Sequence, residues 1–224
     1  MAITDWPPEH RPRERLLAGG AAQLSDAELL AVLLRSGRRG RSAVECSAEL
    51  LARFGGLRPL LAAPGGVAMN ESGLGPASWA MLQAALELGR RNLRAALRER
   101  DALASPGSVR AFLSAWLRDR EVEVFAGLFL DSQNRLIAAE ELFRGTLTQT
   151  SVYPREVLRR ALELNSAGVI VAHNHPSGVA EPSAADRLLT ASLKSALGQL
   201  DIPVLDHLIV GAERCFSFAE AGIL

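Results

Sequence analysis

The sequence predicts a mixed α/β protein, with helices in its first hundred residues and alternating helices and strands after them. Apolar residues recur at helical spacing up to about residue 100. From about residue 120, short apolar runs bounded by turn residues alternate with helical segments. The charge changes as well: residues 1–100 carry 14 basic and 10 acidic side chains, whereas residues 101–224 carry 11 and 15. We therefore expect a helical domain over 1–100 and an α/β domain over 101–224.

The composition is that of a folded protein that needs no disulfides and no membrane. Hydrophobic residues make up 48% of the 224 residues and charged residues 22%, which is sufficient for a packed core. Two cysteines, Cys46 and Cys215, cannot form a disulfide framework and favour a reducing compartment. No run approaches the ~18 apolar residues of a membrane span, and Met1–Pro12 is too polar and proline-rich for a signal peptide. We expect a soluble, cytoplasmic protein.

Two helix starts are predicted in the first half. Ser25 is followed three residues later by Glu28, which predicts a capping box at the start of a helix. A second helix is predicted from Ser42 to Phe54, because the glycine pair after Phe54 ends its apolar pattern.

A long helix is predicted over residues 76–99, after a turn that contains Gly73 and Gly75. The turn is similar to that of a helix-hairpin-helix motif, in which glycines let the backbone approach a phosphate at a helix N-terminus. Arginines are concentrated near the C-terminal end of the helix. We favour an ordinary helical hairpin with a solvated basic end, and keep DNA binding as the alternative. The candidate DNA contacts are Gly73, Gly75, Arg90, Arg91 and Arg94.

The second half reads as strands and helices in alternation. A helix over 107–118 precedes a buried strand over 123–130, and turn residues 131–134 lead into a partner strand from 136. The remaining predicted elements are a strand or loop over 142–150, a helix over 154–166, a buried strand over 167–172, a helix over 183–200, and strands over 204–210 and 215–219.

The residues that could bind a metal or take part in catalysis follow the strand over 167–172. His173 and His175 are two positions apart, so an extended backbone directs both imidazoles to one side. Ser183 is a suitable N-cap for the next helix, and Asp186 lies on its first turn, where a carboxylate can face the histidines. Two imidazole nitrogens and one carboxylate oxygen suit one zinc ion with an open position for water. An isolated histidine pair would be structural, but the spacing of the serine and the aspartate favours a site.

The order His-x-His, seven residues, Ser, two residues, Asp resembles the JAMM signature of JAB1/MPN/Mov34 metalloproteases. The wider context resembles the bacterial RadC family (UPF0758) over nearly the whole chain. This resemblance rests on residues 173–186, on the segment Leu205-Asp-His-Leu-Ile-Val-Gly, and on the stretches near Arg13 and Ser217. The resemblance implies a JAB/MPN mixed-sheet domain with cytidine-deaminase-like layering. It also implies that His173, His175 and Asp186 bind zinc and that Ser183 helps to hold the tetrahedral intermediate.

The resemblance further implies a glutamate from an earlier strand as the general base. We assign this role to Glu123, because it heads a predicted strand and precedes an apolar residue and a phenylalanine. Glu121, Glu140 and Glu141 are the alternatives, each with an ordinary interpretation as a solvated strand end or turn.

Two features near the histidines need separate interpretation. JAMM proteases have Ser or Thr between the two histidines, where this chain has Asn174. Its side chain should point away from the metal, because strand side chains alternate, but substrate specificity carries over less securely. The His-Asn-His triplet is not an HNH nuclease motif, whose residues are spread over a ββα hairpin.

For Asp206 and His207 we favour a packed, hydrogen-bonded strand pair over a role in supporting the metal ligands.

The predicted function is zinc-dependent hydrolysis of a peptide or isopeptide bond, in which Glu123 activates a zinc-bound water. The alternative is a DNA-binding or DNA-processing protein linked to repair or recombination, with the N-terminal half on the DNA. The sequence predicts neither the protein or peptide substrate nor the oligomeric state.

Overall fold

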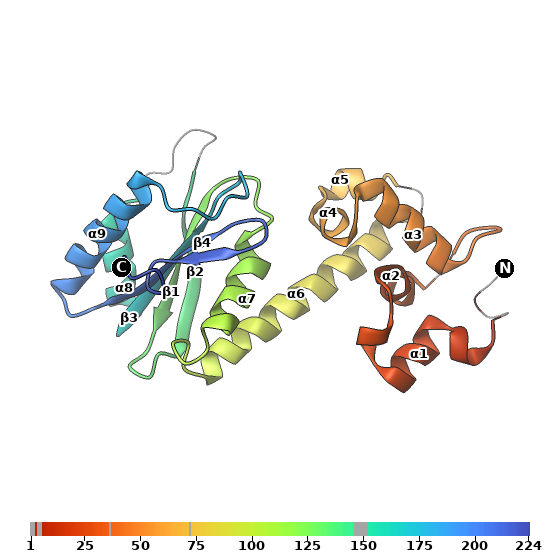
Figure 1. The fold of residues 1–224 in the computed structure, drawn as a ribbon, viewed down its shortest axis with the longest axis horizontal. Helices are drawn as coiled ribbons and strands as arrows, with labels where there is room; N and C mark the ends of the chain where they lie inside the picture. The colour runs from red at the N-terminus through yellow and green to blue at the C-terminus, as the bar shows by residue number, and fades with distance from the viewer. Residues whose placement is uncertain (1–2, 4–5, 36, 72, 146–151) are drawn as a thin grey trace. The chain divides into compact units, whose positions relative to one another are not determined.

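The structure, a computed structural model, describes residues 3, 6–35, 37–71, 73–145 and 152–224 (Figure 1). The chain divides into two compact units, Met1–Leu88 and Gly89–Leu224. The division falls inside α6 (Pro76–Glu99), twelve residues before the predicted boundary. The reason is that Leu97, near the end of this helix, packs into the core of the second unit. None of the described helices is both long and apolar enough to cross a membrane.

The first unit is helical, as predicted. The predicted capping box at Ser25 forms with Glu28, and the structure adds an equivalent box between Ser42 and Glu45. Leu30, Leu50 and Leu60 lie in its hydrophobic core. Its helices are α1 (Pro12–Gly19), α2 (Asp26–Leu34), α3 (Ala43–Phe54), α4 (Leu57–Ala62), α5 (Gly65–Ala68) and the first part of α6, with 3-10 turns η2 (Pro8–His10) and η3 (Ala21–Gln23).

The turn before α6 needs glycine because of its backbone conformation. Gly73 has a φ of +97°, and a Cβ at this position would lie 2.9 Å from the guanidinium of Arg38. Farther along α6, Arg90 donates through Nε to the main-chain oxygen of Ala115, at 2.7 Å. The hydrogen bond from Arg160 is the main cause of the lowered pKa of the Glu140 carboxyl, and the charge of the half-buried Arg94 lowers this pKa as well. The glycine and these two arginines therefore have structural contacts, and DNA contact stays a prediction.

The second unit is built on a five-stranded mixed sheet in the order β2-β1-β3-β4-β5. Only β3 and β4 run parallel; the other neighbouring strands are antiparallel. The predicted turn at 131–134 joins β1 to β2, and Asn134 adopts a left-handed conformation there. The strands are β1 (Val124–Leu130), β2 (Leu136–Arg144), β3 (Gly168–Asn174), β4 (Val204–Val210) and β5 (Cys215–Ser217).

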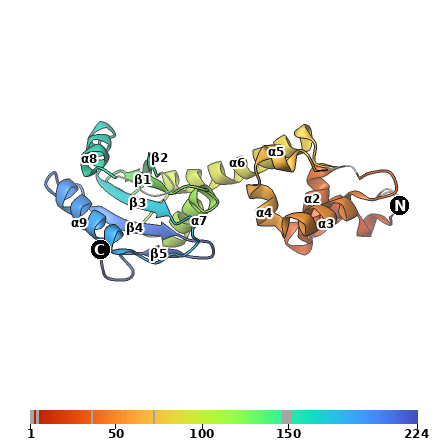
Figure 2. The ribbon, with the colours of Figure 1, turned by 90° about the horizontal axis from the view of Figure 1, so that it is seen from above.

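Helices cover both faces of this sheet (Figure 2). The helix α7 (Pro106–Leu117) packs on one face, together with the end of α6. The helices α8 (Pro154–Glu163) and α9 (Ala184–Gly198) pack on the other face. Along β1, Val124 faces the first core and Phe125 the second, so side chains alternate between two buried faces. The mixed α/β prediction is confirmed, with three layers in the second unit.

The helices and strands lie within a few residues of their predicted bounds. The strand before His173 is longer than predicted and includes the first histidine and Asn174, while the helix at 154 ends at Glu163. For the predicted strand or loop over 142–150, β2 continues to Arg144, and residues 146–151 lie outside the described residues.

Candidate metal centre

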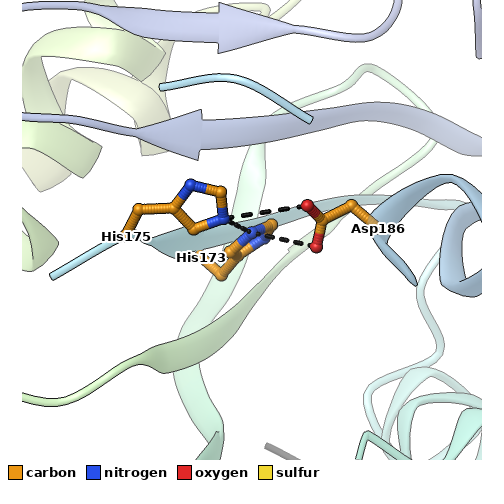
Figure 3. A group of neighbouring side chains, drawn as sticks. All are labelled: His173, His175 and Asp186. Carbon is orange, nitrogen blue, oxygen red and sulfur yellow. Dashed lines mark hydrogen bonds and ion pairs between the residues drawn. The ribbon is translucent and has the colours of Figure 1, made fainter. Parts of the chain in front are cut away.

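Three side chains from two elements converge at the end of β3 (Figure 3). His173 lies in β3, His175 directly follows it, and Asp186 lies on the first turn of α9. The Nε2 atoms of the two histidines are 3.0 Å apart. The Asp186 carboxylate reaches both, with Oδ1 3.3 Å from His173 Nε2 and Oδ2 3.7 Å from His175 Nε2. The structure thus brings together the three predicted ligands, which form a candidate metal site.

The ring of His175 is oriented by the main chain. Its Nδ1 lies 2.8 Å from the carbonyl oxygen of Val179. Because a carbonyl oxygen only accepts, Nδ1 carries the proton and Nε2 presents a lone pair. The loop that provides this carbonyl is held against the end of β4: Gly178 O accepts from Ala212 N at 2.8 Å. A Cβ at Gly211 would lie 2.6 Å from Gly178 O, so the two backbones touch.

The ring of His173 is oriented by a chain of buried side chains. Thr190 Oγ1 donates to the main-chain oxygen of Asp186 at 2.6 Å, so it must accept from His207 Nδ1, which is 2.7 Å away. His207 Nε2 therefore accepts, and the donor is His173 Nδ1 at 2.9 Å. This leaves the lone pair of His173 Nε2 directed at His175.

This hydrogen-bond chain requires a neutral His207. Its side chain is fully buried and stacks on Phe218. Burial, together with the neighbouring His173 and His175, lowers the pKa of His207 to about 3, against the opposing effect of Asp186. At neutral pH the ring therefore accepts at one nitrogen and donates at the other.

Asp186 is both a predicted ligand and part of a helix cap. Its Oδ2 accepts from Ser183 N and Ser183 Oγ, each at 2.7 Å, and Ser183 Oγ accepts from Asp186 N at 3.1 Å. Burial raises the pKa of the Asp186 carboxyl. When a proton rather than a metal ion occupies His173 Nε2, the hydrogen bond and charge of His173, together with the bonds from Ser183, outweigh burial. The net effect holds this pKa well below its usual range, so the carboxylate is ionised at neutral pH.

The donor set fits a metal ion. Two imidazole nitrogens 3.0 Å apart need a proton or a metal ion between them, and the carboxylate supplies the opposite charge. Ligands bound at ~2.0–2.1 Å in tetrahedral geometry lie about 3.3 Å apart, close to the distances found here. Oδ1 of Asp186 is the better ligand atom, because Oδ2 already accepts two hydrogen bonds from Ser183.

Glu123 lies immediately before β1. Its half-buried side chain makes no hydrogen bond or ion pair to the described residues. The register of β1 and β3 pairs Phe125 with His173, and the two rings stack. Continuing this register for two residues places Glu123 opposite His175 and on the face of the sheet that carries both imidazoles.

The contacts by which His207, Thr190 and Asn174 support the site were not predicted from the sequence. Asp206 forms the expected strand-pair contact by accepting from His207 N at 2.7 Å. The His207 imidazole also contacts the predicted ligand His173, so its interpretation as part of a strand pair alone was incomplete. Thr190 was not considered, although it lies four residues after Asp186 and hence on the same helix face. Asn174 points away from the imidazoles, as predicted, and hydrogen-bonds the chain before β1.

Comparison with known proteins places this site in a family. A model described as RadC-like JAB domain matches residues 103–223, and one described as UPF0758 N-terminal matches residues 3–80. A UPF0758 protein of Nitrosospira multiformis is 59% identical over the full length of both chains. The chain belongs to the UPF0758 family. UPF0758 proteins of Thioalkalivibrio sulfidiphilus and Halorhodospira halophila are 58% and 56% identical, also over both full lengths.

The family assignment explains where the site lies in the chain. The RadC-like JAB match covers the whole five-stranded sheet and all three predicted ligands of this UPF0758 protein. The resemblance to the RadC family, inferred from the His-x-His signature, is thereby confirmed, and the second unit is a JAMM-type domain.

Proposed function

We propose that this UPF0758 protein is a zinc-dependent hydrolase of peptide or isopeptide bonds. The observation that carries the proposal is the convergence of two imidazole lone pairs and one ionised carboxylate on a single point. Both rings are fixed with Nε2 toward that point, by Val179 O and by His207. Three ligands of this kind leave a fourth tetrahedral position for water or substrate, which is the arrangement of catalytic rather than structural zinc sites.

Zinc, when bound, would polarise the scissile carbonyl and make hydroxide available near neutral pH. Glu123 would accept a proton from the attacking water and return it to the leaving amine. Ser183 would donate to the oxyanion that develops on the carbonyl oxygen. Its hydroxyl now donates to Asp186 Oδ2, so it must rotate toward the substrate to do this.

The ion pairs of the second unit support Glu123 over two of its rivals. Glu140 accepts from Arg160 through both carboxylate oxygens, at 2.7 and 2.6 Å. Glu141 is bound by Arg120 at 2.6 Å and by Arg144. The hydrogen bonds from Arg160 lower the pKa of the Glu140 carboxyl, which makes it a poor proton acceptor. The Glu141 carboxylate is occupied by its two ion pairs. Glu121 is exposed and lies two residues farther from β1.

The zinc site is tested by metal content of the full-length protein. We expect one zinc per chain in the wild type and in His10→Ala, whose histidine is exposed and remote in sequence from the motif. His173→Ala should lose stoichiometric zinc, because two ligands do not hold the ion. One zinc per chain in purified His173→Ala would overturn the site.

Hydrolysis is tested with the zinc-loaded protein and a pool of fluorescence-quenched peptides that includes lysine-linked isopeptides. Glu123→Gln should keep its zinc and lose turnover by about 10²-fold or more. Glu121→Gln is the matched control, with the same substitution two residues away, and should cleave at the wild-type rate. Equal turnover of wild type and Glu123→Gln would remove Glu123 from the mechanism.

A second proposal is DNA binding by the N-terminal half. It is supported by the net charge of +4 on residues 1–100 and by the exposed side chain of Arg91 on α6. Binding of the full chain to duplex DNA should weaken as salt rises, and Arg91→Ala should reduce the slope of log K against log salt by about one. Absence of binding at low salt would contradict this proposal.

A further inference from the structure

The residue between the two histidines contacts a different strand from the metal ligands. Asn174 is the last residue of β3 and its side chain is buried. Oδ1 accepts from Val124 N at 2.8 Å, and Nδ2 donates to Val122 O at 3.1 Å and to Arg120 O at 3.3 Å. The amide thus uses its oxygen and both of its N–H groups on one short segment of backbone.

These contacts allow only one orientation of the amide. A rotated amide would set Nδ2 against the Val124 N–H and Oδ1 against two carbonyl oxygens, and every contact would become repulsive. A serine or threonine here could not replace the amide, because one short hydroxyl cannot donate to two carbonyls and also accept from an amide.

The segment that Asn174 holds is the one that carries Glu123. Two of the three bonded groups, Val122 O and Val124 N, flank Glu123 directly, and Glu123 O itself accepts from Gly145 N at 2.8 Å. The residues between α7 and Val124 belong to no strand, so these bonds fix the path of the chain before β1.

We propose that Asn174 is a positioning residue that holds Glu123 in place relative to the two histidine ligands. The side chain of Asn174 contacts the backbone on either side of the base, while its main chain is bonded covalently to His173 and His175. One residue therefore sets the distance between base and ligands. The inference rests on the proposed function, because it assigns the role to Glu123 as general base.

The chain contains a matched control at the other end of β1. Ser166 is also buried and joins β1 to the start of β3: its Oγ accepts from Leu130 N at 3.1 Å and lies 2.7 Å from Gly168 O, to which it donates. Both side chains thus fasten the same two strands, but only Asn174 does so beside the metal ligands. Ser166→Ala measures the purely structural effect of losing such a contact.

The experiment compares Asn174→Ser and Ser166→Ala in the full-length, zinc-loaded protein. Asn174→Ser should keep one zinc and a nearly unchanged KM, and its kcat for the cleaved peptide should fall by about 10²-fold, because a shift of ~1 Å in a catalytic group has this effect. Ser166→Ala should keep the wild-type kcat although both variants have a lower Tm. A kcat for Asn174→Ser within threefold of wild type, or an equal fall in Ser166→Ala, would overturn the proposal.

Amide hydrogen exchange of the apoprotein separates this proposal from the proposed function, because it needs neither zinc nor substrate. Asn174→Ser should speed exchange at Val124 by about tenfold and leave Leu130 protected, and Ser166→Ala should do the reverse. Unchanged exchange at Val124 would show that the contact does not hold the segment and would also overturn the proposal. Failure of the wild type to cleave any peptide would overturn the hydrolase function, and with it the role of Asn174.

Discussion

The starts of α3 and α9 use the same capping box for different purposes. In α3, Ser42 N donates to Glu45 Oε2 at 2.6 Å and Glu45 N donates to Ser42 Oγ at 3.2 Å. In α9, Ser183 and Asp186 form the same pair of bonds at 2.7 and 3.1 Å. Only the acid of α9 also faces two imidazoles. The comparison teaches that a local rule for starting a helix can also aim and hold a metal ligand.

The largest expected difference between the two boxes follows from removing their acids. Asp186→Ala should abolish stoichiometric zinc binding, because it leaves two ligands. Glu45→Ala removes the equivalent carboxylate of α3 and should keep one zinc per chain. Metal analysis of the two purified variants measures the difference. Equal zinc content in both would mean that the α9 box is only a helix cap.

Removing the serines gives a smaller difference. Ser42→Ala and Ser183→Ala should each lower the free energy of unfolding by about 1 kcal/mol, the usual effect of losing an N-cap. Only Ser183→Ala should also slow peptide cleavage, by about 10²-fold, the effect of losing one oxyanion donor. Denaturant unfolding and steady-state kinetics are the two measurements. If Ser183→Ala cleaves at the wild-type rate, the hydroxyl serves the helix alone.

The smallest effect is expected from His207, which supports the predicted ligand His173. The start of α3 has no equivalent residue. His207→Phe removes the acceptor for His173 Nδ1 while keeping a ring of similar size, and should weaken zinc affinity by 10–100-fold. His207→Gln offers an amide oxygen near the position of Nε2 and should recover part of the affinity. Competition with a chelator gives both values. Full affinity in His207→Phe would show that the ring of His173 needs no partner.

The features that the sequence predicted well depend on neighbours in the chain. The helix starts at Ser25, Ser42 and Ser183 follow from a serine that precedes a run of helical residues. The ligand cluster follows from strand alternation at the two histidines and from that same helix start. The buried strands could be recognised because both faces of the sheet are covered, which leaves continuous apolar runs.

The features that were missed depend on pairing between distant segments. His207 approaches His173 because β3 and β4 pair in parallel, with Val171 opposite His207. The partners of Asn174 lie fifty residues earlier, across the β1–β3 ladder. Nothing in the spacing of residues indicates either register. The compact units divide within α6 for a similar reason, since the packing of Leu97 is decided by tertiary contacts rather than by helical pattern.

The contact between Gly178 and Gly211 has a consequence for how this protein can change during evolution. The carbonyl that orients His175 belongs to the main chain, and the loop that bears it is fixed by another stretch of main chain. The exposed side chain of Val179 takes no part in this support. Selection could therefore alter the surface next to the reactive centre, and with it the molecules recognised there, while the two glycines preserve the centre itself.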